Sequence, residues 1–211
     1  MANNTRERFL AVALDQFAER GFDGVSIAGI ADVLGLSKQA LLHHFESKEK
    51  LYGEVLDGIS RAFQERIEAT DATPKNDRDA IAALLAALVQ DHRQHPQQTR
   101  LLMRELLDNS RRAERASHWY LRGFLDALVD RVHALPQWGS AGRHHAAAAV
   151  YQFLGAINYF AVSSPTLKAM FSDEFYADMD DCFDAQLEQL IRAGLAAGPA
   201  SVRLEARQRN A

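Results

Sequence analysis

Apolar residues recur three and four positions apart along almost the whole chain, which is the spacing of one buried face of an α-helix. No stretch shows the strict alternation that is typical of a half-buried β-strand. The pattern therefore predicts an all-α fold. The predicted helices span residues 5–20, 27–34, 38–45, 48–69, 79–92, 98–107, 111–135, 143–162 and 173–195.

The starts and ends of the first four predicted helices carry clear local signals. Ser26, Ser37 and Ser47 each stand directly before a predicted helix, where a serine hydroxyl can accept a backbone N–H bond as an N-cap. Gly21 and Gly35 follow helices, where a left-handed backbone conformation ends the helix at little cost. These signals predict two short helices joined by a tight turn.

Residues 27–45 have the pattern of a helix-turn-helix. Ala31 is small where a second helix must cross closely, and Leu41 and Phe45 form the inward face of that second helix. A helix of this length is not stable by propensity alone, so the flanking helices must hold it. An exposed short helix of this kind fits the major groove of DNA, which is about 12 Å wide.

The outward face of residues 38–45 suits DNA recognition. Gln39 can pair with an adenine edge, and Lys38 can reach a guanine or a phosphate. A histidine at position 43 or 44 can donate to a phosphate, and Lys48 lies in the first turn of the next helix, where phosphate is also attracted. The alternative interpretation is a solvated face of a small helical bundle.

Overall charge does not contribute to this prediction. The chain has a net charge of −4, and residues 1–60 hold six Lys and Arg against nine Asp and Glu, so 6 − 9 = −3. Nucleic-acid binding must therefore depend on where the charges lie, because a strongly basic domain is absent. The hydrophobic fraction of 47% is ordinary for a soluble protein, and the single cysteine, Cys182, excludes an intramolecular disulfide.

Residues 9–56 resemble the N-terminal domain of the TetR family of bacterial transcription regulators. The resemblance rests on "FAERGFDGVSIAGIADVLGLSKQALLHHFESKEKLYGEV" at 17–55. It implies a homodimer with one helix-turn-helix per subunit and a C-terminal domain that binds an inducer. The implied DNA-binding residues are Ser26, Ser37, Lys38, Gln39, Ala40, Leu42, His43, His44 and Lys48. Ala40 and Leu42 depart from the family pattern, which often has threonine and usually has tyrosine there, so the operator sequence stays open.

The second half of the chain contains a candidate ligand pocket. The stretch at 151–162 is apolar nearly all round, which is typical of a helix buried on most sides. One interpretation is the core of a dimer bundle, and the other adds a small-molecule cavity. The residues proposed for that cavity are Met103, Trp119, Tyr120, Phe124, Tyr151, Gln152, Asn158 and Tyr159. We expect a mostly apolar or aromatic inducer.

The predicted organisation is a DNA-binding domain at 1–47, a ligand-binding and dimerisation domain at 48–196, and a flexible tail at 197–211. The homodimer is predicted to form through 143–163 and 173–195, where Phe183, Leu187, Leu190 and Ile191 form an apolar stripe. His92 and His95 are interpreted as polar residues at a helix end, with no metal site. We find no catalytic motif, and we expect no cofactor, no membrane contact and a cytoplasmic location. The predicted function is a repressor that a small, mostly apolar inducer releases from a near-palindromic operator. The alternative is a DNA-binding regulator controlled by a protein partner without a small-molecule pocket.

Overall fold

The computed structural model describes residues 2–69, 78–108 and 120–200, and within these ranges the chain is helical with no strand. The all-α prediction is confirmed. The helices are α1 (Ala2–Arg20), α2 (Ile27–Val33), α3 (Lys38–Phe45), α4 (Lys48–Ala69), α5 (Arg78–Gln94), α6 (Pro96–Asp108), α7 (Arg122–His133), α8 (Arg143–Met170) and α9 (Asp173–Ala197).

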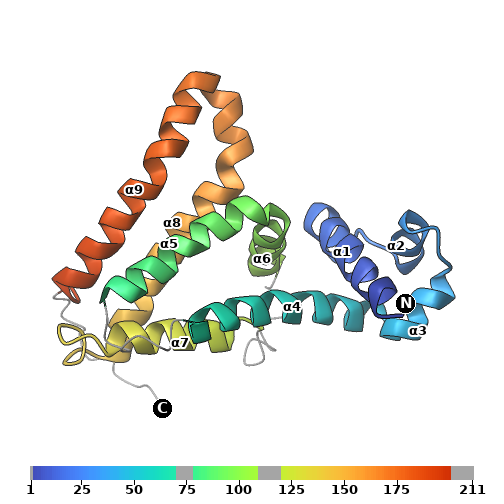
Figure 1. The fold of residues 1–211 in the computed structure, drawn as a ribbon, viewed down its shortest axis with the longest axis horizontal. Coiled ribbons are helices and arrows are strands. Elements are labelled where there is room, and N and C mark those ends of the chain that lie inside the picture. The colour runs from blue at the N-terminus through green and yellow to red at the C-terminus, as the bar shows by residue number, and fades with distance from the viewer. Residues whose placement is uncertain (1, 70–77, 109–119, 201–211) are drawn as a thin grey trace, which may run out of the picture.

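Three helices form a small unit at one end of the molecule, and α4 leads from it into the larger helical body (Figure 1). The core of the small unit consists of Phe9, Phe17, Ile30, Leu41 and Phe45, which are all at most 1% exposed. The Phe9 and Phe45 rings meet edge to face with centroids 6.3 Å apart. This core holds the two short helices that could not be stable alone.

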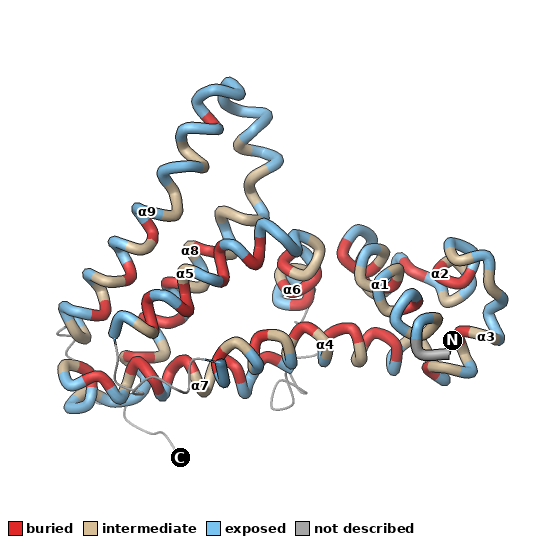
Figure 2. The backbone as a smooth tube through the Cα atoms, in the orientation of Figure 1, coloured by how far each residue is buried: buried red, intermediate tan, exposed pale blue. Residues whose placement is uncertain are grey.

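The larger body is a helical bundle from which α8 and α9 project as an antiparallel arm (Figure 1). Near the base, α5 packs against α6, α7, α8 and α9. The buried stretches follow α4, α5 and the lower part of α8, whereas the outer arm is mostly exposed (Figure 2). By length and composition alone α8 could cross a bilayer; it packs against α5, α6, α7 and α9, and 28% of its most apolar stretch is buried in the subunit.

The predicted end of the helix at residue 162 is wrong, because α8 runs on to Met170 with Pro165 inside it. A proline removes one helical N–H and disfavours the preceding turn. Contacts with α9 hold α8 on both sides of the proline, and Lys168 Nζ after it lies 5.0 Å from the centroid of the Tyr176 ring. The Phe160 and Phe183 rings stack with centroids 3.6 Å apart, and the Ser164 and Tyr176 hydroxyls are 2.6 Å apart.

The predicted helix at 111–135 is also corrected. Residues 120 and 121 form a turn, and α7 begins at Arg122 and ends at His133. The Tyr120 carbonyl accepts a hydrogen bond of 2.6 Å from Ser60 Oγ of α4, which directs the backbone away from a continuous helix. Residues 109–119 lie outside the described residues.

The apolar stripe predicted on the last helix is divided in the fold. Leu187 and Ile191 are 4% and 0% exposed, because α9 packs against α5 of the same chain. Leu190 is 55% exposed and Phe183 is half-buried. Only part of the predicted stripe is therefore available to a second subunit. Other exposed apolar side chains lie further along the arm, at Val162, Met170, Phe171 and Phe175.

Candidate functional site

The helix-turn-helix begins with two capped helices. Ser26 Oγ accepts a 3.0 Å hydrogen bond from the Gly29 N–H, and Ser37 Oγ accepts a 3.2 Å bond from the Ala40 N–H. Both caps were predicted from the sequence, and both are present. Gly35 has φ +66, so the left-handed turn between α2 and α3 occurs where the glycine predicted it. The caps fix the direction in which α3 leaves the turn.

The exposed face of α3 holds Lys38, Gln39 and His43, whereas Leu41 and Phe45 point into the core. Ala40 packs against that core. Ala40 and Leu42 are both half-buried. The His44 ring lies against the Phe9 ring, with centroids 5.9 Å apart. The outer face of α3 is therefore polar and made of side chains that can reach base edges or phosphates.

The junction between α3 and α4 has a feature that sequence reasoning missed. Glu46 has φ +62 and ψ −44, and the Ser47 N–H lies 2.6 Å from the Phe45 carbonyl oxygen, which is a three-residue turn. Ser47 then caps α4 through a 3.1 Å bond from the Lys50 N–H. Lys48 Nζ lies 4.2 Å from the centroid of the Phe22 ring, so a cation–π contact orients this lysine beside the first turn of α4.

An apolar cavity of about 300 Å³ lies in the larger body among α4, α5, α6, α7 and α8. Five of the residues proposed for the ligand pocket line it: Met103, Phe124, Tyr151, Asn158 and Tyr159. Tyr120 and Gln152 are corrections to that proposal, because neither belongs to the lining. Tyr120 lies against α4 through Ser60, and Gln152 is exposed on α8. Trp119 lies outside the described residues.

Sequence reasoning missed most of the apolar lining, which comes from Phe63, Leu88, Leu102, Leu106, Leu121, Leu125 and Leu154, together with Gly155. Their spacing shows that each helix has an apolar face, but it does not show which faces meet around a space. Phe63 and Phe124 stack with centroids 4.9 Å apart and form an aromatic wall. The cavity also includes His92, which was interpreted only as a helix-end residue.

His92 lies near the end of α5 but is buried, at 7% exposed. Its Nδ1 is 2.6 Å from Thr99 Oγ1, and Asn158 lies with it on the wall of the same cavity. Burial lowers the pKa of His92 below its ordinary value of 6.5, although Asp91 and an interaction with Asn158 oppose the shift and Arg66 adds to it. The imidazole is therefore held neutral at the wall of the cavity.

The pKa shift of His92 predicts a pH dependence of stability. Below pH 6.5 the unfolded chain gains a proton on this imidazole that the folded chain does not, so the free energy of unfolding falls as the pH falls. For a His92→Gln variant we expect that slope to be smaller, by at most about 1.4 kcal/mol per pH unit. Urea unfolding between about pH 5 and pH 8 measures it. Identical slopes in both proteins would contradict the expectation.

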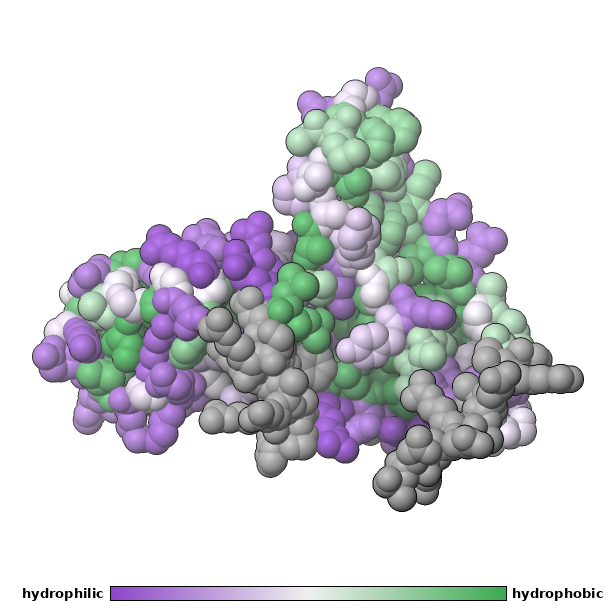
Figure 3. Space-filling view, turned by 180° about the vertical axis from the view of Figure 1, so that it is seen from behind, coloured by the Kyte–Doolittle hydropathy of each residue, from purple (hydrophilic) through white to green (hydrophobic). Residues whose placement is uncertain are grey.

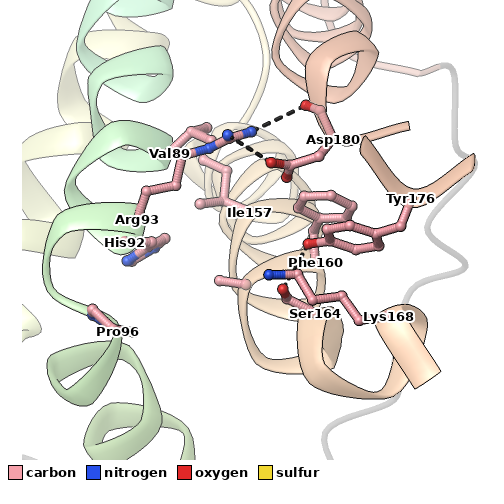
Figure 4. Close-up of a pocket in the computed structure, with 11 residues that line it drawn as sticks. Val89, His92, Arg93, Pro96, Ile157, Phe160, Ser164, Lys168, Tyr176 and Asp180 are labelled. Atoms are coloured by element: carbon pink, nitrogen blue, oxygen red, sulfur yellow. Dashed lines mark hydrogen bonds and ion pairs between the residues drawn. The ribbon is translucent and has the colours of Figure 1, made fainter. Parts of the chain in front are cut away.

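A second hollow of about 290 Å³ lies between the end of α5 and the arm formed by α8 and α9 (Figure 4). Arg93 crosses it from α5 to α9, with 3.0 Å to Asp180 and 2.9 Å to Asp184. Two carboxylates thus neutralise this guanidinium and tie the arm to the body. Lys168 Nζ lies 5.0 Å from the centroid of the Tyr176 ring on the opposite wall. We interpret this hollow as a structural junction.

Within the described parts of the chain, no group of three or more His, Cys, Asp and Glu side chains is placed to hold a metal ion. The rings of His144 and His145 are tilted by 36° to each other, with centroids 4.5 Å apart. Cys182 is exposed on α9. The chemistry of the molecule therefore concentrates on the outer face of α3 and in the apolar cavity.

Comparison with known proteins agrees with this geometry. Residues 9–55 match the family model for "Bacterial regulatory proteins, tetR family". The chain is 33% identical over 141 residues to the HTH-type transcriptional regulator RutR of Escherichia coli K12, a match that covers 65% of this chain and 63% of RutR. It is 42% identical over 54 residues to the HTH-type transcriptional repressor KstR2 of Rhodococcus jostii, which is 26% of each chain.

Solved structures share the whole fold at low identity. A putative fatty acid metabolism regulator from Clostridium perfringens superposes with a TM-score of 0.71 and 12% identity, covering 93% of this chain and all of that one. A TetR-family regulator from Bordetella parapertussis gives 0.69 at 21% identity, covering 92% and 97%. The local match of the helix-turn-helix, the longer match to RutR and the shared fold agree. The DNA-binding domain of the chain belongs to the TetR family of bacterial regulatory proteins.

Proposed function

We propose that this protein is a dimeric DNA-binding transcriptional repressor that a small, mostly apolar inducer releases from a near-palindromic operator. The observation that carries the proposal is the outer face of α3, where Lys38, Gln39 and His43 are exposed on a helix whose start and direction are fixed. The names of RutR, a transcriptional regulator, and KstR2, a transcriptional repressor, support the same activity.

Selection of bound fragments from a pool of random duplexes tests the DNA activity. We expect an enriched, near-palindromic site, because two recognition helices related by a two-fold axis reach major grooves about 34–36 Å apart. A pool that shows no enrichment over several rounds would contradict sequence-specific binding. Enrichment of a single half-site would contradict the dimer but not the recognition helix.

The cavity favours control by a small molecule over control by a protein partner alone. Its volume of about 300 Å³ lies at the small end of the range for ligand pockets, and its lining is apolar with few polar groups. The alternative, a regulator that a protein partner controls, needs no such cavity. A partner-controlled protein would show no thermal stabilisation by any compound in a metabolite panel.

Helix α6 connects the cavity to the DNA-binding unit. Leu102, Met103 and Leu106 of α6 line the cavity. Arg104, between these residues in the sequence, contacts α1 instead. Its Nε donates to the Ala18 carbonyl at 2.8 Å, and its Nη2 donates to the Glu19 carbonyl at 2.7 Å. These carbonyls belong to the last turn of α1, where the helix leaves them without partners of its own.

A second contact supports the same connection. The hydroxyl of Tyr52 on α4 donates to the carboxylate of Glu105 on α6, and both side chains are buried. One short segment of α6 therefore lines the cavity on one side and contacts both α1 and α4 on the other. A ligand that displaces α6 would move the recognition helices of a dimer relative to each other, provided that it binds the DNA-incompetent arrangement more tightly.

For an Arg104→Ala variant we expect the ligand and the operator each to bind within about threefold of the parent, whereas the ligand should weaken DNA binding about tenfold less than it does in the parent. The physical reason is the loss of a coupling contact worth about 1–2 kcal/mol. Fluorescence anisotropy of a labelled operator, with and without a ligand found by thermal shift, measures the effect.

The matched control for this variant is Arg100→Ala, which removes an exposed arginine from the same helix. We expect its ligand response to equal that of the parent. If Arg104→Ala also responded like the parent, coupling through the end of α1 would be wrong, while DNA binding and ligand binding would both stand.

A further inference from the structure

The polar groups of the apolar cavity lie at two separate places. Tyr151 and Tyr159 are 59% and 74% exposed, so they stand at its mouth. His92 is 7% exposed and Asn158 is half-buried, so they form the inner polar end. Between these ends the lining is apolar or aromatic. A ligand in this space would meet hydrocarbon along most of its length and hydrogen-bonding groups at its inner end.

The inner polar end is fixed from three helices. His92 comes from α5, Thr99 from α6 and Asn158 from α8. The 2.6 Å contact between His92 Nδ1 and Thr99 Oγ1 holds one side of the imidazole, and Thr99 is itself only 2% exposed. An interaction with the Asn158 side chain reaches the same imidazole, and both residues line the cavity. His92, held by Thr99, is therefore placed to orient the Asn158 amide at the cavity wall.

Asn158 retains hydrogen-bonding capacity beyond this contact. An asparagine side chain offers two N–H donors and a carbonyl oxygen with two lone pairs, and an interaction with His92 would use only one of these. A pure hydrocarbon in the cavity would remove water from the remaining groups without replacing its hydrogen bonds. A ligand with one donor or acceptor at the matching end would replace them.

Charge argues against an ionic ligand. Among the described residues that line the cavity there is no Asp, Glu, Lys or Arg. The nearby guanidinium of Arg66 is already paired with the carboxylate of Asp91. An ion inside the cavity would lose its hydration and find no opposite charge, which is a strongly unfavourable transfer.

The shape of the wall favours a ring. Phe63 and Phe124 are each 4% exposed and lie at an interplanar angle of 29° along one side of the space. Aromatic rings pack well against such a pair in offset or tilted arrangements. Met103 on α6 adds an adaptable thioether on another side.

We propose that the cavity binds an uncharged aromatic molecule with a single hydrogen-bonding group, and that Asn158, oriented by His92, recognises that group. This inference rests on the proposed function in that it identifies the chemical class of the inducer. It assigns to His92 a positioning role toward the ligand that its place in the sequence did not indicate.

Four probes with one skeleton test the proposal: propylbenzene, 4-propylphenol, 4-propylbenzoate and 4-propylbenzylammonium. Binding to the full-length protein is measured by calorimetry and by thermal shift. We expect 4-propylphenol to bind at least about tenfold more tightly than propylbenzene, which corresponds to about 1.4 kcal/mol, and both charged probes to bind more weakly than propylbenzene. Equal binding of the first two, tighter binding of either ion, or no binding of any probe would overturn the proposal.

The Asn158→Leu variant tests the residue assignment, because leucine has nearly the same size without the amide. We expect it to lose the preference for 4-propylphenol over propylbenzene while it keeps its affinity for propylbenzene. The matched control is Gln152→Leu, which removes an amide from an exposed position of α8 outside the cavity. An Asn158→Leu protein that retained the full preference would overturn the role of Asn158. If it did not fold, the parent's order of affinities for the four probes would still decide the ligand class.

DNA binding without ligand, measured on the same samples, separates this inference from the proposed function. Intact DNA binding with the wrong order of probe affinities would overturn the inference and leave the DNA-binding regulator. The expected order of affinities without any specific DNA binding would support the inference and overturn the regulator.

Discussion

A protein in which aspartate replaces Leu190 is expected to be monomeric at micromolar concentration and to bind its operator about 100-fold more weakly than the parent. Leu190 is 55% exposed on α9, so the substitution should leave the fold of the subunit intact. In the proposed dimer the new carboxylate would lie in an apolar contact and lose its hydration. Without the dimer, each recognition helix binds only its own half-site. Light scattering and operator titration measure both effects.

The arm itself is the reason to expect this effect. Hydrophobic side chains extend along the exposed surface of α8 and α9 in the space-filling view (Figure 3). They include Met170, Phe171 and Phe175, which are 68%, 38% and 53% exposed. A surface of this kind is typical of a contact with another protein. In a two-fold dimer the same face of each subunit would cover the other.

The control is Gln189→Asp, which places the same charge one residue away on a polar face of α9, near Arg192. We expect this variant to remain dimeric and to bind the operator like the parent. A Leu190→Asp protein that stayed dimeric would move the interface to another face of the arm. Monomers that kept the parent's operator affinity would contradict the need for two linked half-sites.

The helix-turn-helix could be predicted from the sequence because its signals are local. Ser26 and Ser37 bond to backbone N–H groups three residues away, and Gly35 adopts its left-handed conformation within the turn itself. Ile30 and Leu41 are fully buried, as their positions on the two short helices require. Each of these properties depends on neighbours that the periodicity already reveals.

The arm could not be predicted in the same way. The predicted helix at 143–162 ended before Pro165, which lacks the N–H that a helix needs. The helix continues because α9 contacts α8 on both sides of the proline, at Phe160 and Ser164 before it and at Lys168 after it. The division of the α9 stripe has the same origin. Whether Leu187 faces its own α5 or a second subunit depends on the path of the whole chain.

The lining of the cavity could be predicted from the sequence only in part. Its aromatic and polar members on α8 could be proposed from composition, and Asn158 and Tyr159 do line it. His92 was missed because its burial results from the approach of Thr99 on α6 and Asn158 on α8. Periodicity could have placed His92 beside Leu88 on one face of α5, four residues away, but not at the wall of a space. A cavity is a property of several helices together, and the sequence pattern describes each helix singly.

Replacing Gln39 by alanine is expected to weaken binding to the selected operator by about 1–3 kcal/mol and to relax specificity at one base position. Gln39 is exposed in the first turn of α3, directly after the Ser37 cap, so its amide can lie against a base edge. An amide pairs with the two hydrogen-bonding atoms of adenine, and alanine removes both bonds without disturbing the core. Titration of the operator and of its single-base variants measures the change.

Lys48→Ala is the contrasting variant, because this lysine is expected to contact a phosphate and not a base. It lies in the first turn of α4 and is oriented by the Phe22 ring. We expect the variant to weaken all duplexes about equally and to reduce the slope of log affinity against log salt by about one. Specificity should stay that of the parent, whereas Gln39→Ala should keep the salt slope and relax specificity at one base position. If both variants bound the operator and its base variants as the parent does, α3 would not be the recognition helix.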